Sequence, residues 1–202
     1  LDATGGRFGP FAGQLFVGDQ TQASVMRVFL EKVGGEYQGA CFPFRSGFDC
    51  GVNRLVFGKD GNLFVGMTDR GWGSVGTRRW GLQRLAWTGK EPFEVLEMRA
   101  RSDGFEVSFT RPVDRRHAAD PSSYAMASWT YHRWAKYGSD PIERKDLRVR
   151  SARPSSDGRS VRLIVDDLRP RFVHELHLSG IRDEAGSPLL HADAYYTLNR
   201  IP

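Results

Sequence analysis

The sequence predicts an all-β protein: a partial β-propeller of about two blades followed by a β-sandwich. Short apolar and polar alternations recur between turns, and no helical periodicity persists over three turns. Residues 13–19 return almost unchanged as residues 61–67, at an offset of 48 residues. In the second half, short strands follow one another at spacings near ten residues, which is typical of a sandwich of about 100 residues.

The repeat is the reason for predicting a propeller. A period near 50 residues with several short strands per unit is the pattern of propeller blades. Because a closed ring needs typically four to eight blades, two blades indicate part of something larger. We therefore expect terminal blades at residues 1–97 and a sandwich at residues 98–202, with the remaining blades of a parent chain as partners.

The first half divides into strands by its own turn signals. Asp60-Gly61 predicts a hairpin between its flanking strands, because glycine adopts the positive φ angles that tight turns require. Gly34-Gly35 predicts another turn. The expected strands are residues 15–19, 25–31, 36–40, 52–57, 63–67, 82–87 and 93–99.

The second half is read in the same way. Asp-Gly and Gly-containing turns are expected at residues 156–159 and 183–186, and residues 120–124 predict a turn or a single helical turn. The expected strands are residues 105–109, 147–152, 160–165, 174–178 and 195–198.

Charge and hydropathy narrow the function classes. The net charge is +5 and the pI is about 9.5, values that raise the question of nucleic-acid binding. The arginines are interleaved with acids, and the basic runs are only Arg78-Arg79 and Arg115-Arg116, so we expect no nucleic-acid partner. No apolar run approaches the roughly 18 residues of a membrane span, so none is expected.

Two cysteines, Cys41 and Cys50, fall in one loop. A local disulfide is expected if the compartment is oxidising, and two free, partly buried thiols are the alternative. No CxxC, CxxCH or Cys/His cluster is present, so we expect no metal site in this chain.

The first candidate ligand-binding group is Asp69, Arg70 and Trp72, in a Gly-rich loop after an expected inner strand. The Arg70 guanidinium could pair with a carboxylate or phosphate, and Trp72 could stack on a sugar. The alternative is a structural Arg–Asp pair with a tryptophan packed between blades.

The second candidate group is Arg45, Asp49 and Arg54, around the cysteine loop. Charged groups beside Phe44 and Phe48 suggest a partly desolvated site. An Arg–Asp ion pair that orders a long loop is the alternative.

Two further features lie in the second half. His174 and His177 stand on an expected strand, where a spacing of three sends them to opposite faces and disfavours a shared metal. The segment 129–137 is rich in aromatic residues. It could be a sugar- or partner-binding hairpin, or a strand pair whose rings pack on the propeller.

Two resemblances cover nearly the whole chain. Residues 13–19, 54–66 and 68–73 resemble the last blades of glucose/sorbosone dehydrogenase-like propellers. The second half resembles bacterial immunoglobulin-like domains, and the motifs are residues 105–114, 155–163 and 176–186. The combination resembles large secreted proteins of planctomycete-type bacteria.

These resemblances imply a function for a parent protein. Such dehydrogenases use pyrroloquinoline quinone and calcium, with a catalytic histidine in an early blade, so no catalytic residue or cofactor is expected here. The chain would form propeller wall and channel rim of a sugar or alcohol dehydrogenase. The alternative is a non-catalytic carbohydrate- or protein-binding module of a cell-surface complex. A carbohydrate and a c-type cytochrome domain are the implied partners, and the implied location is secreted, periplasmic or cell-surface.

Overall fold

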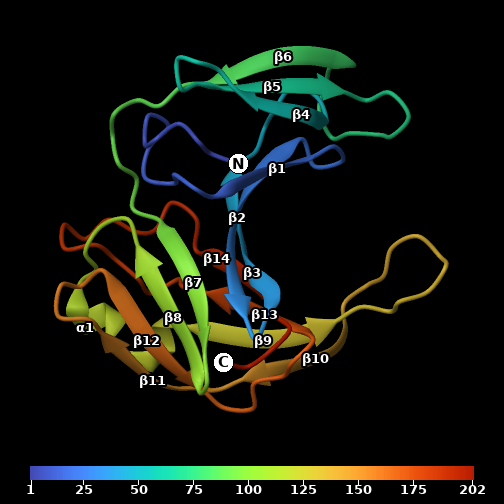
Figure 1. Cartoon of the computed structure of the whole chain (residues 1–202). Coiled ribbons are helices and arrows are strands. Elements are labelled where there is room, and N and C mark those ends of the chain that lie inside the picture. Colours follow the sequence, from blue (N-terminus) through green and yellow to red (C-terminus); the bar gives the residue numbers. More distant parts are fainter. The chain divides into compact units, whose positions relative to one another are not determined.

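The computed structural model describes all 202 residues and is built almost wholly of strands (Figure 1). The strands form three antiparallel sheets, none of which closes into a barrel, so the all-β prediction is confirmed. The contacts divide the chain into two units. The first comprises Leu1–Phe29 and Cys41–Glu91, and the second comprises Leu30–Ala40 and Pro92–Pro202.

The first unit contains a three-stranded sheet of order β4-β5-β6. The hairpin predicted at Asp60-Gly61 is confirmed, since Gly61 has φ +83° and the Asp60 carboxylate accepts from the Asn62 amide at 3.1 Å. The strands are β4 (Val52–Phe57), β5 (Leu63–Thr68) and β6 (Trp80–Leu85).

A second hairpin begins in the first unit. Strand β1 (Leu15–Asp19) pairs with β2 (Ser24–Val33), which turns into β3 (Glu36–Arg45). Gly18 on β1 lies so close to β4 that a Cβ would collide with the Val52 side chain, so this approach requires glycine.

Aromatic rings fill the core of the first unit. Phe8 makes edge-on contacts with Phe16 and Phe57, at 5.6 and 5.2 Å between centroids. Beside this cluster, the fully buried guanidinium of Arg27 lies 4.0 Å from the Phe11 ring centroid and donates to the Gln14 side chain at 2.6 Å. The buried charge is therefore held by a π face and an amide oxygen.

The second unit is a two-sheet sandwich. One sheet has the order β11-β12-β8-β7, and the other continues β3 with β14-β13-β9-β10. The strands are β7 (Val95–Arg101), β8 (Gly104–Phe109), β9 (Ala125–Thr130), β10 (Ile142–Leu147), β11 (Val149–Pro154), β12 (Ser160–Val165), β13 (Phe172–His177) and β14 (Asp193–Leu198). A short helix α1 (Arg115–Ala118) and a 3₁₀ turn η1 (Pro121–Ser123) connect β8 to β9.

The core of the sandwich forms between its sheets. Phe105 on β8 lies 5.2 Å from the Tyr196 ring on β14 and 5.3 Å from the His174 ring on β13. All three side chains are fully buried, so residues from both sheets enclose one core.

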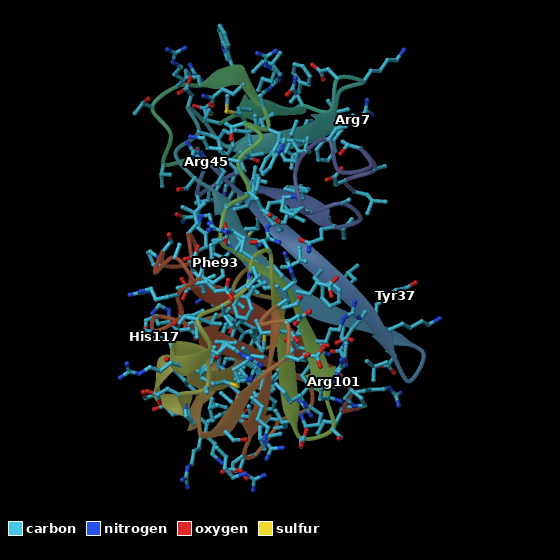
Figure 2. All side chains as sticks on the ribbon, turned by 90° about the vertical axis from the view of Figure 1, so that its left-hand side faces the viewer. Arg7, Tyr37, Arg45, Phe93, Arg101 and His117 are labelled. Carbon is cyan, nitrogen blue, oxygen red and sulfur yellow. The ribbon has the colours of Figure 1, made fainter.

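The tip of the β2–β3 hairpin belongs to this second unit, and Tyr37 lies there (Figure 2). The Gln38 side chain, nearly fully buried, accepts from the Asn199 and Arg200 amides and donates to the Arg200 carbonyl. The Glu31 carboxylate accepts from the Tyr196 hydroxyl at 2.5 Å and from the Ala100 amide at 2.7 Å. Side-chain hydrogen bonds thus attach the tip to β14 and β7.

The propeller prediction is wrong, and the two repeat copies show why. The first copy is β1, an edge strand that pairs only with β2, whereas the second copy is β5, the central strand of its sheet. Equivalent blades would place both copies in equivalent positions. The ten-residue strands β2 and β3 instead extend into the sheet that contains β14. Similar local sequence therefore serves two different strand environments.

The hairpin or strand pair expected at residues 129–137 is displaced in the structure. β9 overlaps this segment only at residues 129–130, and β10 begins beyond it at Ile142. β10 carries four consecutive charged residues, 143–146, which hide its alternation. The contact boundary also differs from the expected 97/98 division: it lies at Glu91/Pro92, and the hairpin tip joins the second unit.

Candidate functional site

The first predicted group lies in the loop after β5. The Asp69 carboxylate is 3.6 Å from Arg79 Nε and makes no ion pair with Arg70. The Trp72 indole donates to the Thr21 hydroxyl at 2.8 Å, although half of this side chain is exposed. The structure therefore pairs Asp69 with an arginine that was not predicted and leaves Arg70 exposed.

The second predicted group is not brought together. Asp49 pairs with Arg78 at 3.5 Å, while Arg45 is exposed at the end of β3 (Figure 2). Arg54 is exposed on β4, and its guanidinium donates to the Asn53 carbonyl. What the structure does join are the two loops that contain Asp49 and Asp69, since the Arg78 amide donates to the Asp49 carbonyl at 2.9 Å.

Both cysteines are free thiols in the structure. Cys41 Sγ lies 3.6 Å from Met26 Sδ, and Cys50 is buried. Burial raises the pKa of the Cys41 thiol, with a smaller opposing effect of Arg27.

The histidines behave as the strand spacing predicts. His174 is buried and His177 is exposed, where its ring lies 2.5 Å from the Asp193 carboxylate. No group of three or more His, Cys, Asp or Glu side chains has the geometry of a metal site. No helix is both long enough and apolar enough to cross a bilayer.

The most developed surface site is a loop that the aromatic segment forms between β9 and β10. Figure 1 shows it projecting beyond the ends of these two strands. We call residues 131–141 the aromatic loop. Trp129 lies on β9, outside the loop, and is buried. Trp134 and Tyr137 in the loop are 51% and 82% exposed. The expectation that these rings pack on other parts of the chain is therefore wrong for the loop.

The aromatic loop has internal order. The His132 ring stacks on Trp134 with centroids 4.6 Å apart and planes 25° apart. The Trp134 indole donates to the Gly138 carbonyl at 2.8 Å, and Gly138 adopts φ +76°, which favours glycine. The His132 amide donates to the Ser139 hydroxyl at 2.9 Å. These bonds connect the two arms of the loop.

The base of the loop is anchored on the sandwich. Glu175 on β13 accepts from the Trp129 indole at 3.1 Å and from the Arg144 guanidinium at 2.6 Å. Tyr131 packs edge-on against Trp129, 4.8 Å between centroids. The loop thus rises from a cross-strand cluster that involves β9, β10 and β13.

Between its arms the loop encloses a partly open cavity of about 550 Å³. Aromatic and polar side chains share its wall, and the Lys136 ammonium lies 5.8 Å from the Trp134 ring centroid. The lining includes His132, Trp134, Lys136, Tyr137, Ser139 and Asp140. Apolar ring faces and hydrogen-bonding groups therefore face the same space.

Comparisons with known proteins assign no family. No family model matches this chain. No curated protein matches it either.

Solved structures do show partial similarity. The N-terminal part of the bacterial S-layer protein SbsC matches with 21% identity and a TM-score of 0.41, over 55% of this chain and 24% of that one. Domains 1–6 of the same protein match with 20% identity and a TM-score of 0.42, over 57% of this chain and 15% of that one. The chain spans about a quarter or less of the structures it matches.

The dehydrogenase resemblance is wrong. The chain's strands form three open sheets and no propeller blades. The resemblance to propeller-bearing secreted proteins of planctomycete-type bacteria is wrong for the same reason, because it required the propeller motifs.

Sequence reasoning identified the loop as far as residue 137 and missed two polar residues that follow. Ser139 and Asp140 line the cavity, yet they stand beyond the segment singled out for its rings. The available signal was Gly138 followed by two polar residues, a pattern typical of a turn that reverses the chain.

Proposed function

We propose that this chain is a non-catalytic carbohydrate-binding module of a secreted or cell-surface protein, and that the aromatic loop is its binding site. The observation that carries the proposal is the cavity of about 550 Å³ between exposed aromatic rings and polar side chains. Its size falls within the roughly 300–1,000 Å³ of typical small-ligand sites.

The chemistry of the loop suits a sugar. Trp134 and Tyr137 offer ring faces for the apolar C–H face of a pyranose. The Asp140 carboxylate can accept, and the Lys136 ammonium can donate, hydrogen bonds to sugar hydroxyl groups. A site with one apolar side and a few polar groups selects a ligand that is itself amphipathic.

The scaffold supports the same proposal. The sandwich pairs its strands as β7-β8-β12-β11 and β14-β13-β9-β10. In chain order this is the ABED and GFCC′ arrangement, and we propose an immunoglobulin-like sandwich on that basis. In such a domain a rigid pair of sheets presents variable loops, and binding residues concentrate in loops of this kind.

The test is titration of the whole chain with chitohexaose, cellohexaose and xylohexaose by calorimetry. We expect saturable binding of at least one of these oligosaccharides. Trp134→Ala and Tyr137→Ala should each weaken that binding by about tenfold or more, since tryptophan and tyrosine commonly dominate binding energy.

A matched control is Tyr37→Ala, an exposed tyrosine on the β2–β3 hairpin and away from the cavity. It should leave the affinity unchanged. Binding that Trp134→Ala and Tyr37→Ala weaken equally, or no binding of any of the three oligosaccharides, would contradict the proposal.

A further inference from the structure

Strand β6 differs from the other edge strands of the three sheets. The pairing of β4, β7, β10 and β11 with their neighbours is interrupted by register shifts, and β1 has only five residues. β6 pairs with β5 without a shift over all six of its residues, and no strand covers its other edge. It contains no proline or lysine.

Of the usual protections against edge pairing, β6 therefore has only one charged side chain, Arg84. Bulges, charged side chains and proline keep exposed edges from pairing with other chains. β10 shows the protected form, with four consecutive charged residues and a register shift. β6 instead exposes Trp80 and Leu82, at 75% and 71%.

The outer face of the β4-β5-β6 sheet extends the apolar surface formed by Trp80 and Leu82. Leu82 stands opposite Gly66, and Arg84 stands opposite Phe64, which in turn faces the exposed Val56 on β4. The alternate residues of β5, Leu63, Val65 and Met67, are buried on the other side. One face of this sheet thus forms core while the other carries uncovered apolar side chains.

The loop and strand around this face carry an excess of positive charge. Residues 70–90 contain five cationic residues and no acidic one. Arg78 and Arg79 pair with Asp49 and Asp69 at 3.5 and 3.6 Å. Arg84 is exposed and makes no direct ion pair, although, after the Asn62 hydrogen bonds, its charge contributes to the lowered pKa of Asp60. An uncovered apolar surface with an exposed arginine outside any direct ion pair is complementary to a partner that is both apolar and acidic.

We propose that the free edge of β6 is a docking site for an extended, acidic segment of a partner polypeptide, which adds to the sheet as a further strand. Backbone hydrogen bonds to the unpaired edge supply affinity, and alternate side chains supply selectivity. On the outer face, the segment places an acidic residue beside Arg84 and apolar residues beside Leu82 and Trp80. This function is independent of the carbohydrate site in the aromatic loop.

The proposal is tested with a fluorescein-labelled peptide, acetyl-Thr-Glu-Thr-Val-Thr-Val-Thr-amide, titrated with the whole chain in anisotropy measurements. Its glutamate and valines match Arg84, Leu82 and Trp80 in an antiparallel register. We expect saturable binding, and slower hydrogen exchange at the β6 amides when the peptide is bound. Arg84→Glu should weaken binding by about tenfold or more.

Charge exchange gives the sharpest control. The same peptide with lysine in place of glutamate should bind the Arg84→Glu chain better than the original chain. Arg45→Glu, which removes an exposed arginine of the same unit away from β6, should leave peptide binding unchanged. Thermal melts of both variants should match the original chain, since both side chains are exposed.

Three outcomes would overturn the proposal. One is the absence of saturable binding up to about 1 mM peptide, the weak end of specific affinities. Another is concentration-dependent dimerisation that Leu82→Lys abolishes, which would make a second copy of this chain the occupant. The third is binding of polygalacturonate with the same arginine dependence but no slowing of exchange at β6, which would make the face a polyanion site.

Discussion

At the scale of single residues, buried polar groups distinguish this protein's cores. Arg27 is held between aromatic faces and Gln14 in the first unit. His174 lies fully buried in the second, where its Nε2 accepts from the Arg169 amide at 3.3 Å. A ring nitrogen that accepts a hydrogen bond must be unprotonated, so the packing requires neutral histidine.

His174 makes stability depend on pH. Burial, with a smaller contribution from Arg169, lowers the pKa of His174 to about 4, while the Phe172 carbonyl opposes the shift. In the unfolded chain the pKa is near 6.5, so between pH 6.5 and 4 the unfolded state binds the proton more readily. The free energy of unfolding should therefore fall by about 3 kcal/mol as the pH drops through this window.

Urea unfolding at several pH values measures this effect. His174→Gln keeps a hydrogen-bonding side chain but cannot titrate, so its stability should fall less steeply from pH 6.5 to pH 4. Equal slopes for the two proteins would show that His174 is not the titrating group.

Arg27 provides a second residue-level prediction. Arg27→Ala leaves a cavity between Phe11 and Phe42 and removes one hydrogen-bond partner of Gln14, which should cost about 3 kcal/mol of stability. Arg27→Met fills most of the volume without a charge and should cost less. Chemical denaturation of both variants measures the difference, and equal losses would mean that packing contributes little here.

At the scale of elements, the β2–β3 hairpin links strands that are distant in sequence. Glu31 and Gln38 lie near its tip and bond to residues of β7 and to residues 196–200, more than 65 positions away. Burial, with an added effect of Glu31, raises the pKa of Tyr196, so the hydroxyl stays protonated and donates to Glu31. The tip is therefore a structural part of the sandwich.

The two glutamates of this hairpin test that role. Glu31→Ala removes the acceptor of the Tyr196 hydroxyl and of the Ala100 amide, and should cost about 2–3 kcal/mol. Glu36→Ala removes an exposed pair with Arg200 and should leave stability nearly unchanged. Thermal unfolding of both variants is the measurement, and similar effects would contradict the assigned difference in burial.

Prediction from sequence succeeded for elements with strong local signals. The Asp60-Gly61 turn and the alternation of β8 and β12 specify their strands without help from distant residues. β9 and β10 were placed wrongly, at residues 129–137, because charges on β10 and aromatic residues around residue 131 obscure a period of two. The aromatic loop was noticed for its rings, but its exposure depends on what surrounds it.

At the scale of the whole molecule, the chain folds as two units, and the tip of the β2–β3 hairpin belongs to the second unit although its sequence lies within the first. Residues 30–40 belong with residues 92–202, although both flanking segments belong to the first unit. A division by sequence alone places these residues in the first domain. Long-range pairing to β14 decides otherwise.

The position of the hairpin tip in the second unit predicts how residues 92–202 behave in isolation. A protein of residues 92–202 lacks the hairpin tip, so β14 becomes an open edge and the Tyr196 hydroxyl loses Glu31. We expect it to melt at a lower temperature than the sandwich in the whole chain and to self-associate, as exposed edges do. Calorimetry and sedimentation velocity measure both effects, and a monomer of unchanged stability would contradict the prediction.

The sequence by itself determined the all-β class, most strand positions, the main turns and the aromatic segment, because period-two alternation and turn chemistry act over a few neighbouring residues. Only the tertiary structure decided that β1 is an edge strand and β5 a central one, that the hairpin tip joins β14, and that the edge of β6 stays open. The physical reason is that strand partners are chosen by packing and hydrogen bonding between distant segments, which similar local sequences do not specify.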